Sequence, residues 1–181
     1  MLNGIDLEGL DAAREGIRAE PENGNVVYGV DMSWKGGVQM EASATGITIG
    51  SENIERDYTW TVDEPPQLLG KSSGPTPQEY LMSGVGACIM VGFVVNASVK
   101  GVTVRSLKIR MSGSLDLAGF MNLRDDAEVK MQGLEYVIEA DTDAAADVLE
   151  DIAAAAVNFS PNAMTIKNGI PLSGSVQAVA A

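Results

Sequence analysis

The sequence predicts an α+β fold in which a mostly antiparallel sheet wraps around one long, buried helix. Three observations predict it. Apolar side chains alternate with a period of two within residues 26–62 and again within 104–115, which is typical of half-buried strands. An uncharged, apolar run lies between these regions, from Tyr80 to Val99. The predicted elements follow in the order strands, apolar helix, strands, second helix and last strand. Such segregation of strands and helices along the chain is typical of α+β folds.

Residues 1–25 are predicted to form an N-terminal helical extension in front of a domain at 26–181. Within residues 6–19, Leu7, Leu10 and Ile17 recur at helical spacing, and Asp6 is available as the N-cap. The segment 21–24 (PENG) then breaks the helix. Because the first residues are acidic and lack the basic region of a signal peptide, we expect a cytoplasmic protein.

The first strands are expected as a hairpin with one wet face. Alternation over 26–34 is followed by Gly36-Gly37 and then by a second alternating run over 38–44. Two further short strands are expected at 47–49 and 58–62.

The central helix has a clear start signal. Thr76-Pro77-Gln78-Glu79 reads as a capping box with Pro at the first helical position, so the helix is predicted over 77–100 with Gly101 just past its end. Apolar and small residues cover every face, which predicts burial all round; a membrane span is the alternative. Three glycines inside the helix predict close approach of another backbone.

The C-terminal half is expected to return to strands. Strands are predicted at 104–115 and 134–138, with an irregular polar segment at 116–133 between them. A second amphipathic helix is expected over 143–159, with Pro161 as its stop, followed by a closing strand at 166–176.

Composition excludes several function classes. With 12 Lys+Arg against 25 Asp+Glu, the net charge of −13 opposes binding to nucleic acid or to an anionic membrane surface. The single Cys excludes an intrachain disulfide, and the absence of His excludes Ser-His-Asp and Cys-His catalysis and His-based metal sites. We therefore expect no resident metal or cofactor, and any catalysis must use Cys, carboxylate, Lys, Arg, Tyr or backbone groups.

Cys88 carries the only thiol of the chain and is the candidate nucleophile. It lies in the middle of the apolar helix, where a lone Cys is more often a small buried hydrophobe. A reactive thiol needs a nearby cation and partial exposure, and here the cation has to be Lys or Arg.

Three segments, in order, resemble the OsmC/Ohr family of osmotically inducible and organic hydroperoxide resistance proteins. The stretch GPTPQEYLMSGVGACIMVGFVVNASVKGV resembles the family's central helix, with Cys88 at the place of its reactive Cys. VRSLKIRMSGSLDLAGFM resembles the strand that follows, and NFSPNAMTIKNGIPL resembles the end of the second helix. The resemblance covers roughly residues 26–178 and leaves the first 25 outside it.

This resemblance implies an intertwined homodimer, with a six-stranded sheet per subunit around paired central helices. It also implies a thiol peroxidase that reduces organic hydroperoxides, in which the reactive Cys becomes a sulfenic acid and a second Cys resolves it as a disulfide. An Arg and a Glu support the reactive Cys in the family.

Carried over by position, the resemblance keeps only part of this site. Cys88 is retained, whereas the resolving position falls at Ser160, which cannot form a disulfide. The supporting Glu falls at Gln78, with Glu79 one residue later and already expected to cap the helix. Lys35 is the nearest cation to the family's Arg position, and it is otherwise a solvated turn residue. The sequence thus resembles a branch with Ser in place of the resolving Cys.

Two functional hypotheses follow. The first is a one-Cys peroxidase that reduces organic hydroperoxides through Cys88 and uses an external thiol reductant. The alternative is a non-catalytic protein of the same fold that binds a small hydrophobic ligand at the dimer seam, and the loss of the resolving Cys motivates it.

Overall fold

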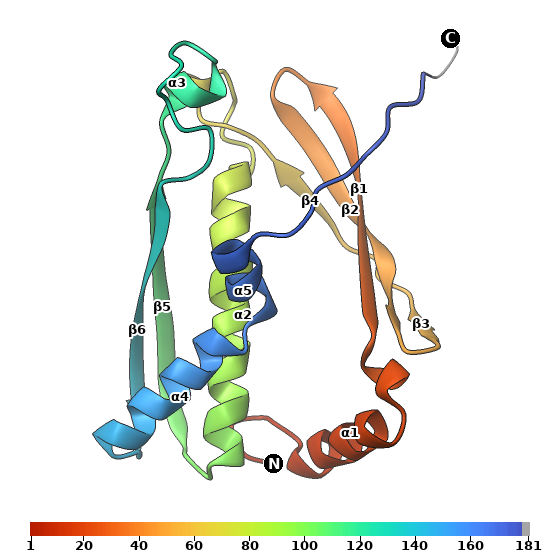
Figure 1. Ribbon diagram of the computed structural model, residues 1–181, viewed down its shortest axis with the longest axis vertical. Helices are drawn as coiled ribbons and strands as arrows, with labels where there is room; N and C mark the ends of the chain where they lie inside the picture. The colour runs from red at the N-terminus through yellow and green to blue at the C-terminus, as the bar shows by residue number, and fades with distance from the viewer. Residues whose placement is uncertain (179–181) are drawn as a thin grey trace.

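The computed structural model describes residues 1–178, so the last three residues of the predicted domain 26–181 lie outside the described residues. The elements follow one another as α1 (Leu7–Ala19), η1 (Pro21–Gly24), β1 (Val26–Gly36), β2 (Gln39–Ile49), β3 (Glu52–Ile54), β4 (Thr59–Val62), η2 (Pro66–Leu68), α2 (Pro77–Val99), β5 (Val104–Ser114), α3 (Leu117–Phe120), β6 (Gly133–Thr142), α4 (Ala146–Asn158) and α5 (Pro161–Asn168). Figure 1 shows α2 as the central element, with β5 and β6 on one side and the other strands on the opposite side. The predicted α+β fold with antiparallel strands around a central helix is confirmed.

The strands form two separate sheets. β2 pairs with β1 along one edge and with β3 and β4 along the other, and all three pairings are antiparallel. β5 and β6 form a second antiparallel sheet of two strands. The single six-stranded sheet implied by the resemblance is therefore absent from the described part of one chain, because α2 lies between the two groups of strands (Figure 1).

The predicted hairpin is confirmed, with one difference in β2. The segments predicted separately at 38–44 and 47–49 form one strand, which continues through Gly46 at φ 106°. A left-handed φ favours glycine, so Gly46 lets the strand bend without ending. The short strand β3 was not predicted.

The central helix begins where the capping box predicts. The Glu79 amide donates to Thr76 Oγ1 at 3.2 Å, and the Thr76 amide donates to Glu79 Oε2 at 2.7 Å. One side of α2 then carries the core, in which Val85, Ile89, Phe93 and Ala97 pack with Ile152 of α4.

The predicted close approach of another backbone is found at one of the three helical glycines, and the other two face side chains. A Cβ on Gly92 would lie 3.2 Å from Ala156 O, so this glycine lets the backbone of α4 approach. A Cβ on Gly86 would lie 3.2 Å from Met111 Cγ of β5. Gly84 faces only the Asn162 side chain, 3.7 Å away.

Burial of α2 on every face is not observed within one chain. Leu81, Val91 and Val99 are 43%, 65% and 47% exposed, because β5, α4 and α5 cover only one side of the helix. α2 is the one helix among residues 1–178 that is long and apolar enough to cross a membrane, with a mean hydropathy of 1.8. The core helix of a soluble fold passes the same criterion, so this composition is weak evidence for a span.

The C-terminal prediction is wrong at 166–176. Pro161 ends the preceding helix as expected, but it also occupies the first position of α5, which Ser160 caps by accepting from the Ala163 amide at 3.2 Å. A hydroxyl before Pro is a helix start signal, and it overrides the strand-like pattern at the first of these residues. Residues 169–178 have no regular structure.

Candidate active site

Cys88 lies at the border between the covered and the open side of α2. Its thiol is free and half-buried. With about 100° per residue in a helix, Leu81 and Val95 lie within about 20° of Cys88, and Val91 within about 60°. Gly92, which contacts α4, lies on the other flank. The sulfur therefore adjoins an exposed apolar strip and is not enclosed in the core.

A side chain of α5 holds the turn of α2 that precedes Cys88. Asn162 Nδ2 donates to the carbonyl of Gly84 at 2.9 Å, four residues before Cys88. A Cβ on Gly84 would lie 3.7 Å from Asn162 Nδ2, which is an ordinary van der Waals contact. The sequence offered no signal for this contact, because nothing placed Asn162 beside the central helix.

Ser160 lies at the start of α5, beside the same helix. It is 2% exposed, and its hydroxyl oxygen caps α5. Ser160 is therefore the N-cap of α5. The residue at the position of the resolving Cys is thus buried, and its hydroxyl stabilises the start of α5.

Glu79 is directed away from Cys88. Nine residues separate them, which corresponds to half a turn around the helix and about 13 Å along its axis. The Glu79 carboxylate accepts from the Thr76 amide, as its capping role requires. Within one chain, Glu79 therefore does not reach the thiol.

Lys35 lies at the tip of the first hairpin. Its Nζ pairs with Glu41 Oε1 at 2.7 Å, and both side chains are about half exposed. The strands of this hairpin pack on one another and make no comparable contact with α2. The structure of one chain therefore keeps Lys35, Glu79 and Cys88 in three separate places.

A buried carboxylate that the sequence did not single out organises the loop before α2. Asp63 is 1% exposed and accepts from the amides of Glu64, Lys71 and Ser73 and from the Ser73 hydroxyl, at 2.6–3.1 Å. These hydrogen bonds, led by those from Ser73, lower the pKa of Asp63 to about 2. The sequence signal that could have indicated Asp63 is an Asp followed by a loop that ends in Ser and Gly. Asp side chains commonly accept hydrogen bonds from the amides of such loops.

Glu64 is the second acid missed by the sequence reasoning. One of its oxygens, Oε2, is buried and has no hydrogen-bond partner among the described residues. Burial raises the pKa of Glu64, and the charges of Glu79 and Asp63 raise it further. The start of α2 therefore gathers three carboxylates, those of Asp63, Glu64 and Glu79.

Asp63→Asn should remove an acid-dependent contribution to stability. Because the Asp63 pKa is lower when folded, its contribution is complete above the ordinary value of 3.8 and is lost as the pH falls toward about 2. Urea unfolding followed by tryptophan fluorescence across this range should show a steeper loss of stability in the wild type than in Asp63→Asn. The exposed Asp125→Asn serves as the control and should keep the wild-type slope. Equal slopes for all three proteins would contradict the role given to Asp63.

The family comparison supports the resemblance seen in the sequence. The family model described as OsmC-like protein matches residues 70–174, which include Cys88, Ser160 and all of α2. No curated protein gives a significant match to the chain.

Solved structures with the same fold are distant in sequence. An OsmC-like protein from Mycoplasma pneumoniae has a TM-score of 0.63 at 17% identity, covering 79% of this chain and 89% of that one. An organic hydroperoxide resistance protein from Elizabethkingia anophelis has a TM-score of 0.54 at 12% identity, with coverages of 79% and 89%. One from Legionella pneumophila has a TM-score of 0.50 at 16% identity, with coverages of 78% and 90%. At these identities the likeness establishes the fold.

The match over residues 70–174 spans more than half of the chain, and the arrangement of strands around α2 agrees with it. The chain belongs to the OsmC-like protein family.

Proposed function

We propose that the protein is a one-cysteine thiol peroxidase that reduces organic hydroperoxides through Cys88. The observation that carries the proposal is the free, half-buried thiol on the central helix, at the edge of an exposed apolar strip. Two proteins of the same fold are named organic hydroperoxide resistance proteins, which supports the reaction class. The apolar surroundings favour a hydrophobic peroxide over hydrogen peroxide.

The first half-reaction oxidises the thiol. The Cys88 thiolate attacks the distal oxygen of the hydroperoxide, so an S–O bond forms while the O–O bond breaks. The alkoxide takes up a proton and leaves as the alcohol, and Cys88 remains as a sulfenic acid. The sulfur is oxidised by two electrons and the peroxide is reduced by two.

The second half-reaction needs an external thiol. Ser160 stands where a resolving Cys is expected and cannot form a disulfide. A reductant thiol therefore attacks the sulfenic acid, which releases water and gives a mixed disulfide. A second reductant thiol then frees Cys88 and leaves the reductant as a disulfide. Cytoplasmic thiol pools supply such reductants, which agrees with the expected location.

The proposal includes a homodimer. Besides the exposed strip of α2, one face of β1 exposes Tyr28, Val30, Met32 and Trp34, each by more than half. Large exposed apolar patches mark interaction surfaces, so both patches are candidate contacts with a second copy. Because both patches are apolar, the strip of α2 in one copy can pack on the face of β1 in the other. In such a pair, Lys35 has to come from the second copy if it is to support Cys88.

Cys88→Ser tests the peroxidase directly. With cumene hydroperoxide and an excess of dithiothreitol, the wild type should consume peroxide and the variant should not, because a hydroxyl cannot replace the thiolate. Ala87→Ser is the matched control, since it adds the same hydroxyl to the neighbouring position and keeps the thiol. The proposal fails if the wild type shows no turnover with dithiol present, or if Cys88→Ser retains it.

A second candidate is a non-catalytic protein that binds a small hydrophobic ligand at the same seam. It is favoured by the other contacts of Lys35 and Glu79, which pair with Glu41 and with the Thr76 amide in one chain and not with Cys88. Native mass spectrometry of freshly purified protein distinguishes the candidates. A stoichiometric ligand without peroxide turnover supports binding, whereas an unliganded mass together with turnover supports the peroxidase.

A further inference from the structure

Residues 2–5 dock where α2 ends and β5 begins. Asn3 Nδ2 donates to Ser98 Oγ at 3.0 Å and to the Val102 carbonyl at 2.8 Å, and Asn3 Oδ1 accepts from the Val104 amide at 2.9 Å. The buried Ser98 hydroxyl also lies 3.1 Å from the Leu2 carbonyl. One amide side chain thus joins the N-terminus to both the central helix and the strand that follows it.

The turn that presents Asn3 is built for this position. Leu2 and Ile5 exchange backbone hydrogen bonds of 2.8 and 3.1 Å around the two central residues. Asn3 and Gly4 have φ values of 52° and 80°, the left-handed conformation that Asn-Gly adopts readily in tight turns. The Asn-Gly sequence and the hydrogen bonds of the turn therefore hold Asn3 in the conformation that reaches the end of α2.

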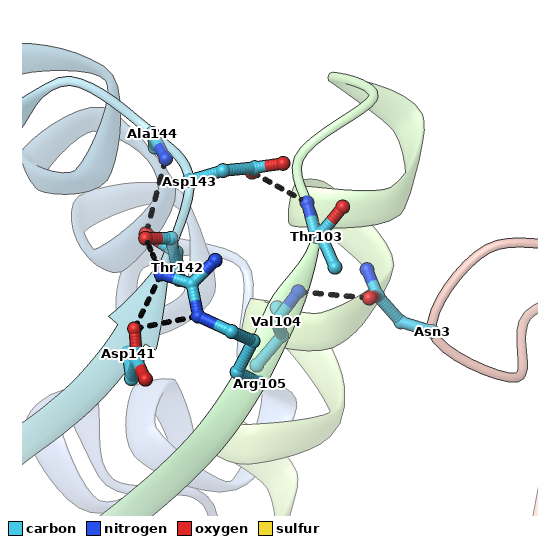
Figure 2. A network of polar contacts seen from close by, with 8 residues as sticks. All are labelled: Asn3, Thr103, Val104, Arg105, Asp141, Thr142, Asp143 and Ala144. Atoms are coloured by element: carbon cyan, nitrogen blue, oxygen red, sulfur yellow. Dashed lines mark hydrogen bonds and ion pairs between the residues drawn. The ribbon is translucent and has the colours of Figure 1, made fainter.

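The surface that receives Asn3 is itself held by polar contacts, as Figure 2 shows. The Thr103 amide donates to Asp143 Oδ1 at 2.7 Å, and Arg105 Nε donates to Asp141 Oδ1 at 2.9 Å. Hydrogen bonds from Thr103 and from Arg105 lower the pKa of Asp143 and of Asp141, respectively. The junction between α2 and β5 is thus tied to the end of β6 and offers a fixed anchor.

The other end of the N-terminal segment is attached to the four-stranded sheet. After α1 and η1, the Asn25 carbonyl accepts from the Gly50 amide at 2.8 Å, at the turn between β2 and β3. Gly50 has φ 55°, and a Cβ there would lie 3.1 Å from Asn23 Cα. Between the two attachments, α1 has 13 residues, none of them buried, and a length of about 20 Å.

We infer that residues 1–25 act as a strut that fixes the position of the four-stranded sheet relative to α2, and that Asn3 is its fastening residue. The sheet meets the rest of the chain again at its opposite end, where the Tyr80 hydroxyl donates to the Thr61 carbonyl at 2.7 Å. Figure 1 shows α1 crossing from the end of α2 to the base of β1. With both ends held, the apolar faces of α2 and β1 keep one separation. The strut goes beyond the peroxidase proposal and does not depend on it.

Asn3→Gly tests the strut, because glycine keeps the left-handed turn and removes the three side-chain hydrogen bonds. Hydrogen exchange of the full-length protein is measured at two amides, Val104 beside Asn3 and Gly50 at the far attachment. We expect exchange at both to accelerate by about tenfold or more. Asn122→Gly is the control, since Asn122 has the same φ of 52° in another loop, and it should leave both amides unchanged.

Each other outcome overturns the inference. Faster exchange at Val104 alone means that Asn3 is a local cap and transmits nothing to the sheet. Unchanged exchange at both amides means that Asn3 fastens nothing. If Asn3→Gly fails to fold, Asn3→Asp replaces it, because its carboxylate still accepts from the Val104 amide but cannot donate to Ser98 or to the Val102 carbonyl. A smaller acceleration of exchange is then expected at both the Val104 and the Gly50 amides. Unchanged exchange at Gly50 in this variant contradicts the strut. Neither exchange measurement depends on peroxide turnover, so the strut and the proposed peroxidase are tested separately.

Discussion

Phe93→Ala is expected to lower the free energy of unfolding by about 3–5 kcal/mol. Phe93 is completely buried on the side of α2 that carries the core, between Ile89 and Ala97 along the helix and with Ile152 of α4 in the same cluster. Truncation to Ala removes the ring from a closely packed site and leaves a cavity that the surrounding helices and β5 fill only in part. Urea or thermal unfolding of the two proteins measures the effect.

The control for this prediction uses the same chemical change at an exposed site. Phe159 follows α4 and is 83% exposed, so Phe159→Ala should change the free energy of unfolding by only about 0.5 kcal/mol or less. Equal effects of the two substitutions would contradict the assignment of the core to this side of α2.

Val91→Asp is expected to separate the proposed dimer. Val91 is 65% exposed in one chain and lies on the apolar strip beside Cys88, so a carboxylate there loses its water when a second copy covers it. We expect the dissociation constant to rise by at least about a hundredfold, as for an unpaired charge in a buried contact. Size-exclusion chromatography with light scattering over a dilution series measures this change.

The matched control places the same charge outside the strip. Val129 is 74% exposed in the loop between α3 and β6, and Val129→Asp should leave the association unchanged. If Val91→Asp associates as the wild type does, the exposed strip of α2 is not the contact surface.

Local signals in the sequence predicted the elements well where side chains act within a few residues. The Thr76–Glu79 capping box located the start of α2, and two-residue alternation located the first hairpin and β5. The same kind of signal was available at Ser160-Pro161, where a hydroxyl before Pro starts α5, and the strand-like pattern of the residues after it gave the wrong element.

Contacts between distant segments were not predictable in this way. The apolar character of α2 predicted burial on every face, but composition does not say whether the covering surface belongs to the same chain. Asn3 accepts from an amide about a hundred residues away, and no periodicity marks it. The candidate site depends on such contacts, so the sequence identified Cys88 but did not place Lys35 or Glu79 relative to it.

The contact of the α2 strip with a second copy is central to the proposed function, because that contact would bring Cys88 to a shared boundary. Sedimentation velocity of the full-length wild type measures it directly. We expect a stable species of about 38 kDa, twice the chain mass of 19.0 kDa, that persists on dilution. A single 19.0 kDa species across the concentration range would contradict this dimer.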